Sequence, residues 1–331
     1  MSFPIVRAAL PALLLLAIAA GCQRKPHGPG PADDPRAFGT PVRMPERSDR
    51  YSDLRQHTFS ELGADADPLL SPDGLTLWFA STLHGPTYNL YEKGPDGRTI
   101  SLFTEDPGDE RFPRMSPDGQ WITFSANRDG NWDLFRKHVS GRGDWVTISA
   151  DPEDELWPTW SPDGRTIAYS VLTPAGWVIR TIDLAGRKTD VAAGIFPAWH
   201  PSRPVIAFQR ARQRDEPWYA IWTVDLSTSR QSELVAGRDW GAIHPVWSPD
   251  GKWLLFATVH KSAIAKEEMR EVHGDDFWVV RESGGLPFAL TDDDDPKGSP
   301  VWARNGRVYF VTPRDGRPNV WSLLPILPRM D

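Results

Sequence analysis

Carboxylates and histidines are the side chains of this sequence with the most potential for chemistry. Acidic residues gather in four short segments, which contain Asp65 and Asp67; Glu105, Asp106, Asp109 and Glu110; Asp151, Glu153, Asp154 and Glu155; and Asp292, Asp293, Asp294 and Asp295. The histidines that could act with them are His84, His244, His260 and His273. Carboxylates and imidazoles bind divalent cations and exchange protons, so what they do depends on how the fold brings them together.

Three interpretations of the acidic segments are open at this point. The first is turn chemistry and solubility, because Asp bonds the local backbone and charged loops keep a surface soluble. The second is recruitment of a basic protein or a cation, because clustered like charge in a cleft focuses the electrostatic field. The third is a metal-assisted catalytic site built from the histidines and the carboxylates.

Familiar metal and catalytic signatures are missing from the sequence. No two histidines have the H-x-x-x-H spacing, and the run from Asp292 to Asp295 lacks the glycine and the terminal glutamate of a calcium loop. The sequence contains no G-x-S-x-G nucleophile elbow, no G-x-G-x-x-G segment and no phosphate-binding loop. We therefore assign no catalytic residue, no metal ligand and no cofactor from the sequence.

An internal repeat must position these residues. The string Ser-Pro-Asp-Gly occurs at 71–74, 116–119, 161–164 and 248–251, with degenerate copies at 200–203 and 303–306. A proline precedes each copy at a constant distance, and these prolines are Pro68, Pro113, Pro158, Pro197, Pro245 and Pro300. Pro, Asp and Gly favour a tight turn, and short β-prone segments follow each one. Each unit therefore predicts about four short antiparallel strands, which is one propeller blade.

The six units predict an all-β, six-bladed propeller of four-stranded antiparallel blades over residues 51–325. The last unit ends after three strands, so we expect an N-terminal segment, Thr58–Leu62, to complete the last blade and close the ring. The loops from outer strands to the next inner strands emerge on one face, where we place the acidic segments and a long insertion at 260–276. This face is the candidate site for a partner or ligand, with the residues Asp106, Asp109, Glu110, Asp151, Asp154, Glu155, His244, His260, His273, Asp292, Asp293, Asp294 and Asp295. We expect His244, directly before Pro245, near the central opening.

The repeat resembles the TolB-type propeller repeat. The pattern runs from Ile148-Ser149 through Pro-x-Trp-Ser-Pro-Asp-Gly to Gly164, and an Asn-x-x-Leu-aromatic strand such as residues 131–135 accompanies it. The resemblance implies a six-bladed propeller, a periplasmic location and a protein-binding role. TolB proteins also carry an α/β domain through which they contact TolA; we expect no such domain here, so that partnership does not transfer. A peptidoglycan-associated lipoprotein, which TolB binds with its propeller, is the partner that the resemblance implies.

The N-terminal segment has the pattern of a targeting sequence. Residues 8–20 are apolar and end in small residues, and Ala19-Ala20-Gly21-Cys22 resembles a bacterial lipobox, in which the signal is cut before a lipidated cysteine. We expect residues 1–21 to be a lipoprotein signal peptide, Cys22 to carry the lipid, and Gln23 to direct the protein to the outer membrane. The alternative is an ordinary cleaved signal with an incidental cysteine.

The remaining regions and the composition narrow the class of protein. Residues 22–50 are rich in proline and should form a disordered tether, and residues 326–331 a C-terminal tail. The formal net charge of −7 argues against nucleic-acid binding, and the single cysteine excludes an intramolecular disulfide.

We expect a monomeric, lipid-anchored, periplasm-facing scaffold that binds an envelope protein. The alternative is a propeller hydrolase or lyase that acts on carbohydrate or peptide at the central opening.

Overall fold

The computed structural model describes residues 50–94, 97–128, 130–213, 216–237, 240–260, 274–293 and 295–328. The expected signal peptide at 1–21, Cys22, the tether up to residue 49, His273, Asp294 and the end of the tail lie outside the described residues. For His260, the backbone is described but the side chain is not. Within the described part of the chain, no helix has the length and apolarity needed to cross a membrane.

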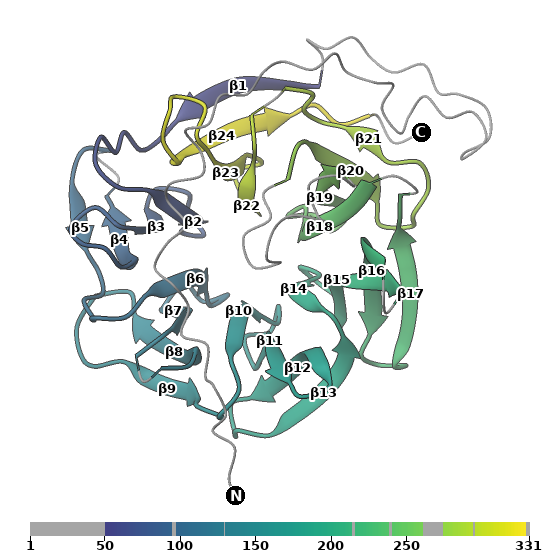
Figure 1. Cartoon of the computed structure of the whole chain (residues 1–331), viewed down its shortest axis with the longest axis horizontal. Coiled ribbons are helices and arrows are strands. Elements are labelled where there is room, and N and C mark those ends of the chain that lie inside the picture. Colours follow the sequence, from purple (N-terminus) through teal and green to yellow (C-terminus); the bar gives the residue numbers. More distant parts are fainter. Residues whose placement is uncertain are drawn as a thin grey trace, which may run out of the picture.

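Six four-stranded antiparallel sheets surround a central axis, which confirms the predicted all-β, six-bladed propeller (Figure 1). From inner to outer strand, the first three blades are β2 (Asp65–Leu70), β3 (Leu77–Ser81), β4 (Asn89–Lys93) and β5 (Ile100–Leu102); β6 (Glu110–Met115), β7 (Trp121–Ala126), β8 (Asp133–His138) and β9 (Val146–Ser149); and β10 (Glu155–Trp160), β11 (Thr166–Thr173), β12 (Gly176–Asp183) and β13 (Lys188–Ala193). The other three are β14 (Ile195–Trp199), β15 (Val205–Gln213), β16 (Glu216–Asp225) and β17 (Arg230–Val235); β18 (Trp240–Trp247), β19 (Trp253–His260), β20 (Phe277–Arg281) and β21 (Phe288–Ala289); and β22 (Gly298–Trp302), β23 (Val308–Thr312), β24 (Asn319–Pro325) and β1 (Tyr51–Gln56).

An N-terminal strand closes the ring, but it lies earlier in the chain than Thr58–Leu62, the segment expected from the sequence. The closing strand is β1, Tyr51–Gln56, which pairs antiparallel with β24. Residues 57–64 are instead needed to cross from the outer edge of the last blade to the inner strand of the first. Thr58 fixes the start of this crossing: its backbone N–H donates to Val320 O at 3.4 Å, and its hydroxyl donates to Asn319 Oδ1 at 3.2 Å. Closure removes an exposed sheet edge at β24.

The four Ser-Pro-Asp-Gly turns join the first and second strands of their blades by the same set of bonds. In the second blade, the Ser116 hydroxyl donates to Asp118 Oδ1 at 2.5 Å, and Asp118 Oδ1 accepts the N–H of Gln120 at 3.0 Å. Gly119 closes the turn with a φ of 73°, a left-handed conformation that glycine adopts without strain. The repeated serines and aspartates are therefore occupied by turn formation. We call this end of the ring the turn face and the opposite end the loop face.

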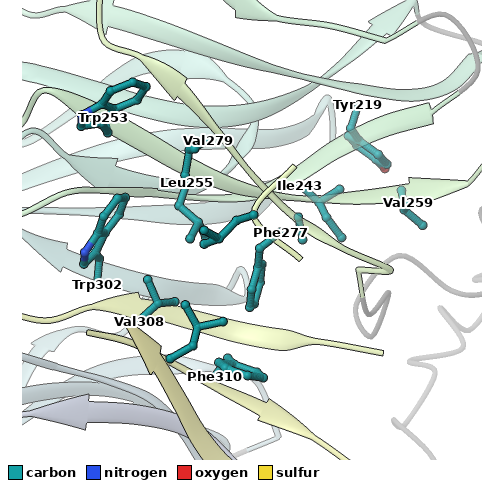
Figure 2. Packing of buried hydrophobic residues seen from close by; sticks show 13 residues of the cluster. Tyr219, Ile243, Trp253, Leu255, Val259, Phe277, Val279, Trp302, Val308 and Phe310 are labelled. Atoms are coloured by element: carbon teal, nitrogen blue, oxygen red, sulfur yellow. The ribbon is translucent and has the colours of Figure 1, made fainter. Parts of the chain in front are cut away.

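Apolar side chains from neighbouring blades fill the spaces between the sheets. Figure 2 shows one such cluster, in which Phe277 of the fifth blade meets Phe310 of the sixth. Their ring centroids lie 5.3 Å apart in an edge-to-face arrangement, and Trp253 and Trp302 belong to the same buried cluster. Each fully buried side chain of this size contributes about 1.5–3 kcal/mol. This packing holds the inner strands at fixed positions around the axis.

Candidate functional site

A bulge interrupts the inner strand of every blade at the residue before the repeat proline. These six residues are Asp67, Phe112, Trp157, Phe196, His244 and Ser299, with φ between 48° and 59°. The register of each inner strand shifts at this point. A left-handed conformation costs a non-glycine residue roughly 1–2 kcal/mol. The fold thus carries the same local strain six times, once in each blade.

Five contacts between neighbouring blades link the six bulge residues in a series from Ser299 to His244. Four of them form a row of rings: the centroids lie 5.6 Å apart for Phe112 and Trp157, 4.0 Å for Trp157 and Phe196, and 4.4 Å for Phe196 and His244. We call Phe112, Trp157, Phe196 and His244 the aromatic arc. The arc is continuous across four successive blades, from β6 to β18. The bulged positions of four inner strands therefore carry aromatic side chains that contact one another.

The remaining two bulge residues form the polar side of the ring. The Ser299 hydroxyl donates to Asp67 Oδ1 at 2.7 Å, which joins the last blade to the first. Asp67 Oδ2 accepts the N–H of Phe112 at 3.2 Å and Nε of Arg111 at 2.5 Å. Burial alone would raise the pKa of Asp67, but Arg111, Ser299 and the Phe112 N–H together hold it below its ordinary value.

Two arginines of β6 lie beside this aspartate. The guanidinium of Arg111 lies 4.3 Å from the ring centroid of Tyr88 and 4.9 Å from that of Phe112. Arg114 donates from Nη1 to Pro113 O at 2.8 Å. Burial lowers the pKa of Arg114, and the charge of Asp67 acts against that shift. The guanidinium of Arg111 therefore lies in the field of two carboxylates, those of Asp67 and Asp109.

Two tryptophans continue the aromatic arc toward the loop face. Trp132 precedes β8, and its ring centroid lies 6.3 Å from that of Phe112. Trp177 stands near the start of β12, with its ring 5.3 Å from that of Trp157. Trp132 is buried, whereas Trp177 is partly exposed. We call Tyr88, Arg111, Trp132, Trp177 and the aromatic arc the axis mouth.

The acidic residues nearest the inner strands are structural groups. Glu110 and Glu155 are the first residues of β6 and β10 and are fully buried, although the sequence placed them in exposed loops. Inner-strand pairing begins at these residues, which carries their side chains between the blades. Thr104 donates its hydroxyl to Glu110 at 2.8 Å, and Ser149 donates to Glu155 at 2.5 Å. Burial raises the pKa of Glu110 to about 8 and that of Glu155 to about 7.

Two further loop carboxylates bind the backbone of the preceding blade. Asp109 accepts the N–H of Tyr88 at 2.8 Å, and Asp154 accepts the N–H of Trp132 at 3.1 Å. Asp109 and Asp154 lie in the segments that lead into the second and third blades. Each bond therefore fixes such a segment to a loop of the preceding blade. The carboxylates thus hold two residues of the axis mouth in place.

The other described acidic candidates form ion pairs within the chain. Asp106 pairs with Arg128 at 3.0 Å, Asp151 with Lys188 at 2.6 Å and Arg180 at 3.4 Å, Asp292 with Arg50 at 3.7 Å, and Asp295 with Arg314 at 3.4 Å. Each pair keeps at least one partner partly open to solvent, and solvent-screened pairs contribute little to stability. They do reduce the free negative charge that the loop face would offer to a basic partner.

Lys297 is a buried cation within the last acidic segment. Its ammonium donates to Asp293 Oδ1 at 2.5 Å, to Asp295 O at 2.7 Å and to Asp275 O at 3.0 Å, and it lies 3.7 Å from Asp276 Oδ1. Only 2% of the Lys297 side chain is exposed. The ammonium therefore occupies the position that a bound cation would need.

The histidines are spread over different surroundings. His244 belongs to the aromatic arc, whereas His84 Nδ1 lies 2.9 Å from the hydroxyl of Tyr91. His260 ends β19, and His273 lies outside the described residues. Among the residues that the structure describes, no group of three or more His, Cys, Asp or Glu side chains could hold a metal ion.

Most residues of the axis mouth were not among the site residues predicted from the sequence. Only His244 was expected near the opening, because it precedes a repeat proline. The same reasoning applied to the other five prolines finds Asp67, Phe112, Trp157, Phe196 and Ser299. Arg111 and Arg114 carry no comparable signal, because the other repeats have no arginine at these positions.

No family model matches the chain. An uncharacterized protein of Agrobacterium fabrum is 30% identical over 81 residues, which are 24% of this chain and 27% of that protein. The chain thus matches less than a third of the length of this curated relative.

Solved structures support the fold over most of the chain. A protein assigned as TolB from Agrobacterium tumefaciens aligns with a TM-score of 0.60 and 20% identity, over 81% of this chain and 91% of that one. TolB from Acinetobacter baumannii aligns with 0.55 and 16%, over 80% and 64%. An oligogalacturonate lyase from Vibrio parahaemolyticus aligns with 0.56 and 11%, over 83% and 95%. The chain is a six-bladed β-propeller in which aromatic and polar side chains of the inner strands contact one another near the axis. More particularly, its propeller is TolB-like.

Proposed function

We propose that this chain is a lipid-anchored propeller of the bacterial cell envelope that binds a protein partner at the axis mouth. The observation that carries the proposal is the composition of that mouth. Trp, Tyr and Arg dominate the energetic centres of protein interfaces, and here Tyr88, Arg111, Trp132 and Trp177 gather at one end of the axis. Loops fixed by internal bonds would lose little entropy when a partner docks.

The envelope location and the anchor rest on the sequence. Cys22 stands at the lipobox position and residues 22–50 would act as the tether, with the propeller at 51–325 as the binding unit. The TolB-like fold supports an envelope role, and Gln23 supports the outer membrane. A peptidoglycan-associated lipoprotein is the first partner to test, because the resemblance to the TolB-type propeller repeat implies such a partner.

A single observation favours a second function, a carbohydrate-active enzyme at the same opening. Propellers with this fold include the oligogalacturonate lyase from Vibrio parahaemolyticus. Turnover of oligogalacturonate by the purified chain, lost on changing His244 to Ala, would establish that alternative and remove the scaffold proposal.

The binding proposal is tested by capture from bacterial envelope extracts. The full chain serves as bait beside two variants, Trp177→Ala at the axis mouth and Leu184→Ala at the turn face. Leu184 follows the same strand, β12, and is 64% exposed. We expect an envelope protein enriched by the unchanged chain and by Leu184→Ala, and depleted at least tenfold with Trp177→Ala. Equal capture by all three baits would contradict the proposal.

A further inference from the structure

Three successive blades carry an aromatic side chain at the same place on the loop face. These residues are Tyr88 before β4, Trp132 before β8 and Trp177 near the start of β12. Their backbone oxygens accept the same hydrogen bond from the start of the next blade, donated by the N–H of Glu110 at 2.7 Å, of Glu155 at 2.7 Å and of Gly194 at 3.1 Å. We call Tyr88, Trp132 and Trp177 the aromatic ladder.

The repeat does not require aromatic side chains at these positions. The shared bond uses only a backbone oxygen, and in the sixth blade Pro318 O accepts the N–H of Asp65 in the same way, at 2.9 Å. The rings of Tyr88 and Trp177 are partly exposed, so they are not needed to fill the core. Partly exposed aromatic side chains that gather at one place indicate a binding surface.

Two members of the ladder contact the aromatic arc directly. The ring centroid of Trp132 lies 6.3 Å from that of Phe112, and the ring centroid of Trp177 lies 5.3 Å from that of Trp157. Phe112 and Trp157 are themselves neighbours, with centroids 5.6 Å apart. The rings of the second and third blades therefore form one connected surface. A surface that passes from blade to blade suits an extended ligand.

Arg111 continues this surface to the first blade. Its guanidinium lies 4.3 Å from the ring centroid of Tyr88 and 4.9 Å from that of Phe112. Nε of Arg111 donates to Asp67 Oδ2 at 2.5 Å, which holds the guanidinium beside the two rings. The connected surface thus spans the first three blades on the loop face.

Two carboxylates beside the ladder are occupied by the backbone of the ladder itself. Asp109 accepts the N–H of Tyr88 at 2.8 Å, and Asp154 accepts the N–H of Trp132 at 3.1 Å. A sugar chain needs polar side chains that converge on its hydroxyl groups, and these two carboxylates already serve the fold. A polyproline II segment has no internal hydrogen bonds and keeps its backbone in water, so it binds aromatic grooves mainly through ring contacts.

We propose that the aromatic ladder binds a proline-rich segment of the partner in the polyproline II conformation. This inference rests on the proposed function and names the chemistry of the partner. The pyrrolidine rings of the segment pack against the aromatic rings and in the gaps between them. A proline-rich segment is stiff and the ladder is held by backbone bonds, so little entropy is lost when the two surfaces meet.

Matched hexapeptides test the proposal on the full chain by ligand-observed NMR. The probe is acetyl-hexaproline-amide, and the control is an acetylated and amidated hexapeptide of alternating glycine and alanine. We expect hexaproline to bind about tenfold more tightly than the control peptide. Equal affinity of the two peptides, or no binding, would overturn the proposal.

Variants of the ladder locate the binding surface. Tyr88→Ala and Trp177→Ala should each weaken hexaproline binding about tenfold because each removes a ring, whereas Tyr88→Phe should bind as the unchanged chain does. Trp121→Ala serves as the control, because Trp121 is a partly exposed aromatic residue at the turn-face end of β7. The unfolding temperature of each variant shows that it is folded. Hexaproline binding that survives in both ladder variants, or that is lost equally in Trp121→Ala, would contradict the assignment.

Other probes separate this inference from its alternatives. Cellotetraose or trigalacturonate binding more tightly than hexaproline would replace the peptide by a sugar chain and overturn the proposal. A benzophenone-bearing amino acid in place of Tyr88 that crosslinks residues 23–49 of the same purified chain would replace the partner by the chain's own proline-rich segment. Envelope capture that depends on Trp177 while hexaproline fails to bind would leave the proposed function standing and reject this inference alone. Hexaproline binding without capture of any envelope protein would support the ladder as a peptide site and reject the proposed function.

Discussion

Ser299 donates its hydroxyl hydrogen to Asp67 across 2.7 Å, although the two residues are 232 positions apart in the chain. Both stand directly before a repeat proline, and both have a positive φ. Their contact joins the first and last blades at the axis, while β1 and β24 join at the outer edge of the last blade. The ring is thus closed at its centre as well as at its rim.

Removal of the Asp67 carboxylate should destabilise the propeller. In Asp67→Ala, Arg111 loses its ion-pair partner and the links to Ser299 and the Phe112 N–H are lost. We expect a loss of about 3 kcal/mol in the free energy of unfolding, measured with urea. Arg187→Ala, which breaks the exposed pair with Asp183, should change the midpoint little. An equal loss in both variants would contradict the role given to Asp67.

Stability should fall as the pH rises from 6.5 to 8. Burial raises the pKa of Glu110 to about 8 from its ordinary value of 4.5. In this interval the unfolded chain has released that proton while the folded chain still holds it, so raising the pH favours unfolding. Glu155 contributes in the same direction up to about pH 7.

His57 changes stability with pH in the opposite direction to Glu110, but only below pH 6.5. Burial lowers the pKa of His57 to about 4, so His57 adds stability as the pH rises from about 4 to its ordinary value of 6.5 and nothing further above it. Glu110→Gln should remove most of the slope between pH 6.5 and 8 in thermal unfolding. Glu105→Gln, an exposed change in the same loop, should leave it. An unchanged slope in Glu110→Gln would count against a protonated buried Glu110.

Lys297 should be replaceable by a metal ion. In Lys297→Ala, the oxygens of Asp275, Asp293 and Asp295 that surround the ammonium lose their cation. Oxygen ligands of this kind suit Ca²⁺, and binding to the folded state alone raises its stability. We expect millimolar CaCl₂ to raise the unfolding temperature of Lys297→Ala by several degrees and to leave the unchanged chain unaffected.

The contrary results of that experiment are equally informative. A calcium response in the unchanged chain would show that the last acidic segment is an open cation site. No response in Lys297→Ala would show that the oxygens do not converge once the ammonium is removed. Arg314→Gln, which changes a neighbouring pair with Asp295, serves as the control and should behave as the unchanged chain.

The lipid anchor is tested by metabolic labelling. The chain expressed in a Gram-negative host should incorporate radioactive palmitate and fractionate with the outer membrane. Cys22→Ser should incorporate none, because the proposal makes the Cys22 thiol the acceptor of the lipid. Label retained in Cys22→Ser would exclude Cys22 as the anchor.

The blades could be predicted from the sequence because each one repeats a local signal. Proline, the Ser-Pro-Asp-Gly turn and the β-prone segments after it act within a few residues, so turn chemistry alone reveals them. The position of the closing strand depends on a contact between the two ends of the chain. Its true site, Tyr51–Gln56, pairs with β24, and no local pattern distinguishes it from Thr58–Leu62.

The site was harder to predict because its chemistry depends on burial. Glu110 and Asp109 are neighbours in an acidic run, yet Glu110 is fully buried and Asp109 binds a backbone N–H. The residue before a proline ordinarily adopts an extended conformation, so the left-handed Trp157 and Phe196 contradict the local expectation. Tertiary packing of six inner strands around one axis overrides that preference.

Photo-crosslinking tests the central claim most directly. A benzophenone-bearing amino acid at Trp177 lies at the axis mouth, and the same amino acid at Leu184 lies at the turn face, at the other end of β12. In growing cells, we predict a discrete crosslinked product with an envelope protein from position 177 and none from position 184. A product from position 184 alone, or none from either, would contradict partner binding at the axis mouth.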